Sequence, residues 1–457
     1  MNVAIRVLIG CLLLFAPWAF GSTEPWSQRT IQTLAGLMVT CVLLKASLNA
    51  GGWNESVCWD WRWGMPFLAL AIYVALQALN PSHDYERTSQ SLLPRTCLGW
   101  LPHSVDAKCT WDAWGMLVTY GVLFWAVCGC FKRVAEVRVL LMVLVVSGFG
   151  LALVAILENV SGEQKLLWVR ESPAPELMGG AFVNRNNYAA YMNLLVPVAL
   201  ALGSCAGETR SKARSKGHPG YLFYFMAAVM AASVLRSGSR AGLVICVLVL
   251  GCWLWNFLFS RNDHARNSRK RLFLTVFLVA AAAAGLLVFS GIGPIAARFA
   301  PPANEEEAQV LEHSNTRPIA YKATLAICRD HWLYGTGAGT FHRVFPYYQP
   351  ASLAGGFWQY AHCDWLQWVA ELGVAGFTLV ACVVIGILQR CLRHGGASRE
   401  HPGAESETLV YRRRILPALG FGLAGVVLHA CVDFPMHIPG VATLAVAYGA
   451  LMYQAVG

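Results

Sequence analysis

Long apolar runs alternate with short polar connections along almost the whole chain. A helix of about 20 apolar residues spans the hydrocarbon core of a bilayer. The first run keeps Pro17, Trp18 and Phe20 where a cleavable signal peptide has small residues, so we expect it to remain as a span. Membrane spans are predicted near residues 3–21, 28–48, 64–80, 112–131, 137–158, 181–203, 220–235, 240–259, 272–291, 363–389, 415–434 and 438–456. The pattern therefore predicts an all-α polytopic membrane protein with about twelve transmembrane helices.

The composition agrees with this class. The chain has 457 residues, of which 56% are hydrophobic and 13% are charged. A soluble domain carries about 25% charged residues, so the deficit excludes a cytosolic globular enzyme and a disordered chain. The net charge of +10 does not by itself indicate a nucleic-acid partner, because basic residues in a membrane protein first of all mark its topology.

Most Lys and Arg residues fall in connections on one side of the predicted membrane. They are Arg6, Lys45, Arg62, Lys132, Arg133, Arg138, Arg210, Lys212, Arg214, Lys216, Arg261, Arg266, Arg269, Lys270, Arg271, Arg390, Arg393, Arg399, Arg412, Arg413 and Arg414. The positive-inside rule then puts both termini in the cytoplasm. The connections 81–111 and 159–180 and the long segment 292–362 fall on the opposite, outer side.

The segment 292–362 is too long for a simple connector, and loops of this length are usually functional. It holds an acidic run at 305–307, a predicted helix from about Pro318 to His331 and an aromatic stretch over 341–360. The glycines at 335, 337 and 339 predict a turn, because no strand–turn–helix pattern surrounds them. We divide the chain into N-terminal helices with periplasmic loops (1–180), a core that includes this large, partly helical loop (181–390), and a cytoplasmic loop with a C-terminal hairpin (391–457).

Several arginines lie at the outer ends of predicted spans, where charges are costly and mark function by default. Arg240 follows a tight turn and opens a helix, where a guanidinium beside unpaired N–H groups favours a phosphate. The alternative is an arginine that only anchors a helix end at the interface, and it applies to Arg236 and Arg185 as well. The polar run 184–187 begins an otherwise apolar span, which indicates that it lines a cavity and does not face lipid.

His362 lies at the outer edge of the tenth predicted span. A neutral imidazole in this position can accept a proton near physiological pH. A histidine that only makes hydrogen bonds at the membrane interface gives the same pattern. The sequence alone leaves both interpretations of His362 open.

A metal site and a disulfide are two further features that the sequence raises. The candidate metal ligands recur every four residues and are His429, Asp433 and His437. Pro435 breaks a helix between them, so a metal site is not favoured. Cys97 and Cys109 share one outer loop, and we expect them to form a disulfide in an oxidising compartment.

Four segments together resemble the O-antigen ligase and O-antigen polymerase superfamily of bacterial inner-membrane glycosyltransferases. They are FVNRNNYAA at 182–190, SRAG at 239–242, the stretch from Arg317 through GTGAGTF at 335–341, and AHCDWLQ at 361–367 with the ELG at 371–373. Their order, the large outer loop and the plan of twelve spans are similar to the family. Cys363 stands where the family often has Asn, and Ala241 stands where Gly is frequent.

The resemblance implies a glycan transferase of lipopolysaccharide or exopolysaccharide biosynthesis. Its donor would be a glycan carried on undecaprenyl pyrophosphate, which is held in the membrane lipid. The glycan would be transferred as a block. The acceptor would be a sugar hydroxyl on lipid A-core for a ligase, or on a second lipid-linked glycan for a polymerase. Neither a nucleotide, a metal ion nor another cofactor would be needed, and nucleic acid would not be a partner.

The resemblance also implies roles for particular residues. Arg240 and Arg317 would hold the pyrophosphate, and His362 would act as general base or orient the acceptor hydroxyl. The residues expected to contact substrate in addition are Asn184, Arg185, Arg236 and Asp364.

Two other classes of protein stay open at this stage. A polysaccharide flippase or secondary transporter also has about twelve spans, but it needs ionisable groups near the middle of the membrane. Here most ionisable groups lie at the outer ends of the predicted spans. A membrane scaffold without enzymatic activity, whose outer loop binds a partner, is also compatible with the composition.

Overall fold

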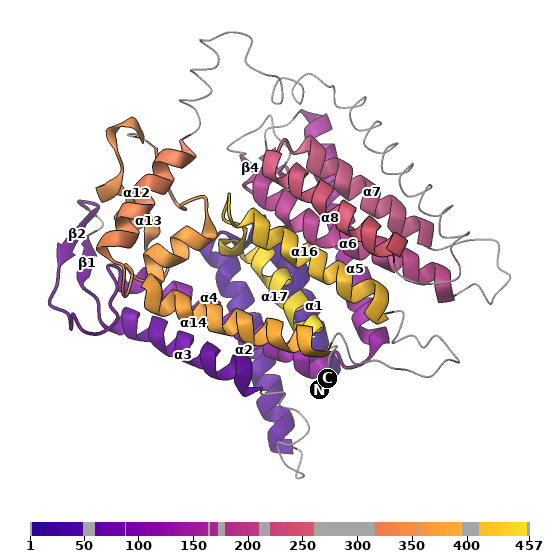
Figure 1. Ribbon diagram of the computed structural model, residues 1–457, viewed down its shortest axis with the longest axis horizontal. Helices are drawn as coiled ribbons and strands as arrows, with labels where there is room; N and C mark the ends of the chain where they lie inside the picture. Colours follow the sequence, from indigo (N-terminus) through magenta and orange to yellow (C-terminus); the bar gives the residue numbers. More distant parts are fainter. Residues whose placement is uncertain are drawn as a thin grey trace, which may run out of the picture.

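The computed structural model describes residues 2–48, 60–86, 88–162, 165–171, 179–209, 220–259, 316–353, 356–394 and 411–454. Eleven helices in these ranges form one bundle (Figure 1). They are α1 (Asn2–Trp18), α2 (Pro25–Leu48), α3 (Trp61–Leu79), α4 (Ala107–Cys130), α5 (Val134–Ser161), α6 (Arg185–Thr209), α7 (Gly220–Arg236), α8 (Arg240–Phe259), α14 (Asp364–His394), α16 (Leu416–His429) and α17 (Pro439–Gln454). The all-α polytopic class that the sequence predicts is confirmed.

The helices match eleven of the twelve predicted spans. Seven of them are long and apolar enough to cross a membrane, and α1 and α7 are shorter apolar helices. The predicted span 272–291 and the acidic run 305–307 lie outside the described residues. The chain is therefore a membrane protein with several spanning helices.

Short connecting elements complete the described fold. Between α1 and α2 is the 3-10 turn η1 (Phe20–Ser22), and η4 (Tyr411–Ile415) is a π-helical turn that leads into α16. The turn η3 (Ala351–Leu353) precedes α14, and the turn η5 (Pro435–His437) precedes α17. Two antiparallel hairpins pair β1 (His83–Glu86) with β2 (Ser91–Pro94) and β3 (Lys165–Leu166) with β4 (Arg170–Glu171).

Ion pairs join the helix ends that lie near the two termini. Arg6 at the start of α1 pairs with Glu136 at the start of α5, at 2.8 Å between Nη2 and Oε1. Arg390 near the end of α14 pairs with Asp60 just before α3, at 3.0 Å. Figure 1 accordingly shows the N- and C-terminal ends close together. The opposite end of the bundle, where α6 and α14 begin, is called the site end below. Which end faces the cytoplasm stays a prediction.

Helix α6 occupies the centre of one half of the bundle, against α5, α7, α8 and α16. Every residue in its most apolar window is buried inside the protein, although the helix carries several polar side chains. Its polar side chains therefore meet protein and not lipid: Asn193 Nδ2 donates to the carbonyl of Gly242 in α8 at 2.9 Å. Burial of this kind removes the need for a fully apolar sequence.

A small subdomain lies on the site end, beside α3 and α14 (Figure 1). It contains α12 (Arg317–Asp330), α13 (Phe341–Tyr348) and the β1–β2 hairpin. The helix α12 confirms the one predicted from about Pro318 to His331. Its core packs Ile327 of α12 against Phe345 of α13 and Val105 of the 95–106 connection. Arg343 ties the subdomain to α4, since its Nε donates to Asp106 at 3.1 Å.

The helix α14 is broken near its start, and the glycine turn fills the break. Gly373 has φ 63° and ψ −177° inside α14, so carbonyls around it lack helical partners. Backbone N–H groups of the turn supply them: Thr336 N donates to Ala370 O and Gly337 N donates to Glu371 O. The Glu371 carboxylate in turn accepts from Gly339 N at 2.8 Å. The glycine turn that the sequence predicts is thus confirmed as a structural bridge between the subdomain and the bundle.

The expected disulfide does not form. Cys97 and Cys109 both have free thiols, and the Cys109 Sγ donates to Asp106 Oδ2 at 3.2 Å. Cys109 lies in the first turn of α4, so its side chain is directed by the helix towards its capping residue. A shared loop was not enough to bring the two sulfurs together.

We expect Gly373→Ala to destabilise the protein. A Cβ at this position would lie 2.3 Å from the carbonyl oxygen of Leu333, and the positive φ disfavours a side chain. The free energy of unfolding should fall by about 2 kcal/mol or more, seen as a lower melting temperature in detergent. Gly99→Ala is the control, because its Cβ would meet nothing within 4 Å. Equal melting temperatures for Gly373→Ala and wild type would contradict this account of the break.

Candidate active site

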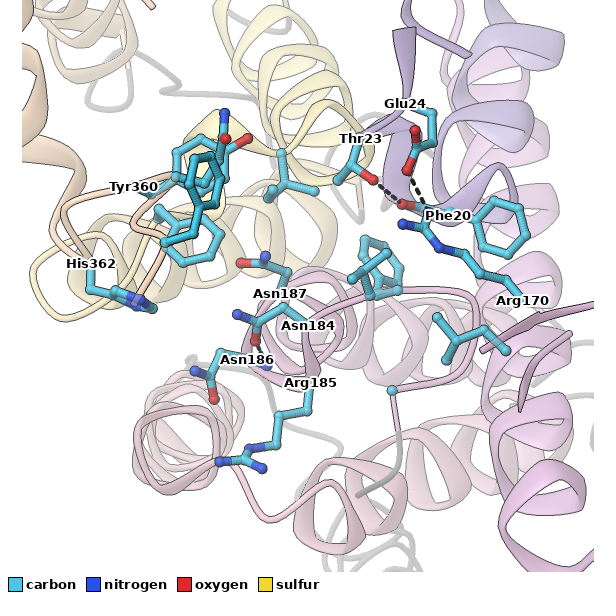
Figure 2. Close-up of a pocket in the computed structure, with 18 of the residues that line it drawn as sticks. Phe20, Thr23, Glu24, Arg170, Asn184, Arg185, Asn186, Asn187, Tyr360 and His362 are labelled. Atoms are coloured by element: carbon cyan, nitrogen blue, oxygen red, sulfur yellow. Dashed lines mark hydrogen bonds and ion pairs between the residues drawn. The ribbon is translucent and has the colours of Figure 1, made fainter. Parts of the chain in front are cut away.

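Six segments meet around a cavity of about 810 Å³ at the site end. They are the η1 turn with residues 23–24 before α2, the β3–β4 hairpin, the 179–187 segment that leads into α6, the start of α12, the 357–362 segment before α14, and the 434–438 turn after α16. Figure 2 shows His362 and Tyr360 on one side of this space and Arg170 with Glu24 on the other. We call it the main cavity.

The carboxylate of Asp433 holds this site together. Asp433 follows α16, and 1% of its side chain is exposed. Its Oδ2 accepts from Arg317 Nη2 at 3.1 Å and also binds the amide Nδ2 of Asn186, while its Oδ1 lies 3.2 Å from His362 Nδ1. A single buried acid therefore contacts groups from α12, α6 and the segment before α14.

The charge of Asp433 is stabilised by these contacts. Burial on its own raises the pKa of the carboxyl, but the hydrogen bond from His362 and the positive charge of Arg317 outweigh it and lower the pKa below its usual range. A buried carboxylate is tolerated when it is paired and hydrogen-bonded in this way. Arg317 is further fixed by a bond of 2.9 Å from its Nη1 to the carbonyl of Val432.

His362 is held in an unusual backbone conformation. Its φ is 56°, in the left-handed region that non-glycine residues rarely adopt. Tyr321 Oη donates to the His362 carbonyl at 2.7 Å, and burial raises the pKa of Tyr321 to about 12, so this donor keeps its proton. A conformation of this type costs about 1–3 kcal/mol and persists only where the surroundings fix it.

The Asp433 contact determines what His362 can do chemically. When Nδ1–H donates to Asp433, the neutral ring carries its lone pair on Nε2. About a quarter of the His362 side chain is exposed, and it lines the main cavity (Figure 2). A carboxylate that orients an imidazole in this manner is the arrangement of a general base.

The start of α6 contributes both structure and charge. Asn184 caps the helix, because its Oδ1 accepts from Asn186 N at 2.8 Å. Arg185 is the first residue of α6 and lines the main cavity beside the positive end of the helix. Arg317 and Arg170 also line it, and Arg170 pairs with Glu24 at 2.6 Å. Three guanidinium groups against one lining carboxylate make this cavity suitable for an anion.

The structure brings together four of the predicted site residues and leaves three elsewhere. Those that line the main cavity are His362, Arg317, Arg185 and Asn184. Arg236 is buried at the end of α7 and Arg240 is exposed at the start of α8, and neither lines it. The reason is that Gly242 of α8 packs against Ala189 in the second turn of α6. The residues of α6 that line the main cavity lie in its first turn. The prediction that Arg240 opens a helix is confirmed.

Asp364 also lies outside the main cavity. Its carboxylate is fully buried, accepts from Met436 N at 2.8 Å and binds His437 Nδ1. It therefore positions the turn after α16 and does not itself face the main cavity. His437 is engaged by Asp364 while Asp433 binds His362, so the spacing of four residues in the sequence does not produce one converging ligand set in the described part of the chain.

Sequence reasoning missed Asp433 as the centre of the site and Asn186 as its partner. The sequence placed Asp433 near the end of the predicted span 415–434 and raised it only as a candidate metal ligand, with no indication of these contacts. Those contacts join residues that are 71, 116 and 247 positions apart. The available signal was an acidic residue near the end of a predicted span. Such a residue can have a functional or a structural role, and only its contacts distinguish the two.

We expect Asp433→Asn to lower the free energy of unfolding at neutral pH by about 2 kcal/mol, because Arg317, whose side chain is 34% exposed, and His362 lose their anionic partner. Because the folded-state pKa of Asp433 is lowered, its contribution is present above the ordinary Asp pKa of about 4 and is lost as pH falls below it. The difference in melting temperature between wild type and Asp433→Asn should therefore shrink on acidification below pH ~4.

The matched control is Asp84→Asn, which removes an exposed carboxylate paired with Arg95. Its effect at neutral pH should stay within about 1 kcal/mol. An Asp433→Asn protein that melts like wild type at neutral pH would remove Asp433 from the centre of the site.

Residues 225–381 match the model of a family described as O-antigen ligase. The match includes Arg317, His362 and the glycine turn, together with α8, α12 and α13. A comparison with curated proteins finds no match.

Proposed function

We propose that this chain transfers a glycan from undecaprenyl pyrophosphate to the hydroxyl of an acceptor sugar, which the match of residues 225–381 to the O-antigen ligase family supports. The reaction takes place on the periplasmic face of the bacterial inner membrane, at the main cavity. The family match supports a membrane glycosyltransferase of the O-antigen ligase or polymerase type.

The observation that carries the proposal is the shared carboxylate. Arg317 and His362 bind different oxygens of Asp433, so a cation and a base are held at a fixed separation beside one cavity. Transfer from a pyrophosphate carrier needs both groups: a cation where the leaving group gains charge, and a base where the acceptor loses a proton.

The acceptor oxygen attacks the anomeric carbon of the donor glycan and forms the new glycosidic bond, and the bond from that carbon to the pyrophosphate oxygen breaks. The acceptor proton passes to His362 Nε2. The electron pair of the broken bond stays on undecaprenyl pyrophosphate, whose charge is stabilised by Arg317 and Arg185. Asp433 stabilises the imidazolium that forms.

Arg240 does not line the main cavity, so any contribution that it makes to donor binding is made away from Arg317 and His362. Its guanidinium lies at the start of α8, outside the lining of the main cavity. We expect its replacement to weaken donor use less than the replacement of Arg317. Arg236, buried at the end of α7, is proposed to support the same turn.

Purified protein with a synthetic undecaprenyl-pyrophosphate glycan and an acceptor tests the proposal. Arg317→Ala and His362→Ala should each lower transfer by about 100-fold or more. Each also removes a partner of the buried Asp433, so transfer is measured on folded protein, well below the lowered melting temperature of each variant. Arg329→Ala is the matched control, since Arg329 is exposed on the same helix and does not line the main cavity. We expect it to transfer like wild type.

Equal activity in Arg317→Ala, His362→Ala and wild type would contradict the assignment of the site. No transfer by wild type, with transport of the glycan across a reconstituted bilayer, would favour a flippase. The glycans recovered from cells that lack the protein distinguish the two transferase types: uncapped lipid A-core indicates a ligase, and single-unit glycans indicate a polymerase.

A further inference from the structure

A second cavity adjoins the main one and differs from it in chemistry. Its volume is about 600 Å³, and we call it the aromatic cavity. The two cavities share the 357–362 segment, with His362 on the boundary. Arg317, Arg185 and Arg170 line only the main cavity. Apart from His362, no described side chain around the aromatic cavity carries a formal charge.

Aromatic rings and neutral polar groups make up most of its lining. The rings are Phe357, Trp358, Tyr360 and Phe434. Phe357, Tyr360 and Phe434 also border the main cavity, so the two cavities differ in their arginines and not in these rings. Phe357 is 78% exposed, which is unusual for a large apolar side chain beside a cavity. Tyr360 stacks on Phe434 with centroids 4.3 Å apart, so part of this surface is rigid. Flat apolar rings of this kind pack well against the C–H face of a sugar.

The neutral polar groups have unused hydrogen-bonding capacity. The side chains of Ser352 and Gln359 make no hydrogen bond to another residue in the described ranges, and Thr316 makes no cap to α12. An amide and two hydroxyls offer both donors and acceptors, which suits sugar hydroxyl groups. A pyrophosphate would find no cation here and is favoured by the main cavity instead.

We propose that the aromatic cavity is the subsite for the acceptor glycan, a neutral, hydroxyl-rich oligosaccharide. This rests on the function proposed above for the main cavity. The donor pyrophosphate lies with Arg317, the acceptor sugar packs on Phe357 and Tyr360, and the reacting hydroxyl meets His362 where the two cavities join. Ser352 and Gln359 select the acceptor by hydrogen bonds to its other hydroxyls.

Two neighbouring residues of η3 allow a matched steric test. Ser352 and Ala351 are both exposed, but only Ser352 lines the aromatic cavity. Ser352→Trp should raise KM for the acceptor by about tenfold or more and leave KM for the donor unchanged. Ala351→Trp should change neither constant. The assay uses whichever of lipid A-core or lipid-linked glycan supports transfer by wild type.

A second variant tests the stacking contact. Phe357→Ala should raise KM for the acceptor by about tenfold, by loss of the ring surface. Trp332→Ala is its control, because Trp332 is an exposed aromatic residue of the same subdomain that lines neither cavity. Slow hydrolysis of the donor by water should be unaffected in Ser352→Trp, Ala351→Trp and Trp332→Ala, since it needs no acceptor and none of these residues lines the main cavity. Phe357 lines both cavities, so its variant is judged by the KM for the acceptor.

The chemistry of the occupant is tested with the acceptor glycan freed from its lipid by mild acid. The Ser352→Trp effect should persist with this soluble acceptor, because the subsite recognises sugars. An effect confined to the lipid-bearing acceptor, an equal rise of KM for the donor, or an acceptor KM equal to that of wild type would each overturn the proposal. A wild-type protein that transfers nothing would instead refute the underlying function.

Discussion

One buried carboxylate determines the arrangement on which the site depends. Asp433 is almost fully inaccessible, and an isolated charge in such a place is unfavourable by several kcal/mol, of order 5. It is stable only because Arg317, His362 and Asn186 converge on it from three other segments. The need to pair this charge therefore fixes how α6, α12 and the start of α14 meet. A base and a cation reach the same cavity as a consequence.

The broken helix α14 gives this arrangement a rigid support. Its free carbonyls at 370 and 371 bind the glycine turn, and the Glu371 carboxylate binds backbone N–H groups of the same turn. Irregular backbone at this depth is stable because protein groups satisfy it. The subdomain that carries Arg317 is thereby attached to the membrane helix that follows His362. The Glu371 carboxylate therefore has a structural role, because it accepts hydrogen bonds from the backbone of the glycine turn.

Under the proposed function, two adjoining cavities would let one site hold two glycans. Guanidinium groups and a helix start give the main cavity a positive character, whereas no arginine, lysine or carboxylate among the described residues lines the aromatic cavity. His362 borders both. The acceptor specificity could then change through Ser352 and its neighbours without changing how the arginines hold the donor. The chemistry and the acceptor specificity then reside in different side chains.

The sequence by itself determined the membrane class, eleven of the helices, the turn at Gly335–Gly339 and the helix after Arg317, because apolar length, glycine and proline act locally. It also pointed to His362 and Arg317 through their motif. Only the tertiary structure decided that Asp433 joins them, that Arg240 and Asp364 lie outside the main cavity, and that Cys97 and Cys109 stay apart. Those outcomes depend on helix packing between residues far apart in the chain, such as Gly242 against Ala189, and no local pattern encodes such a contact.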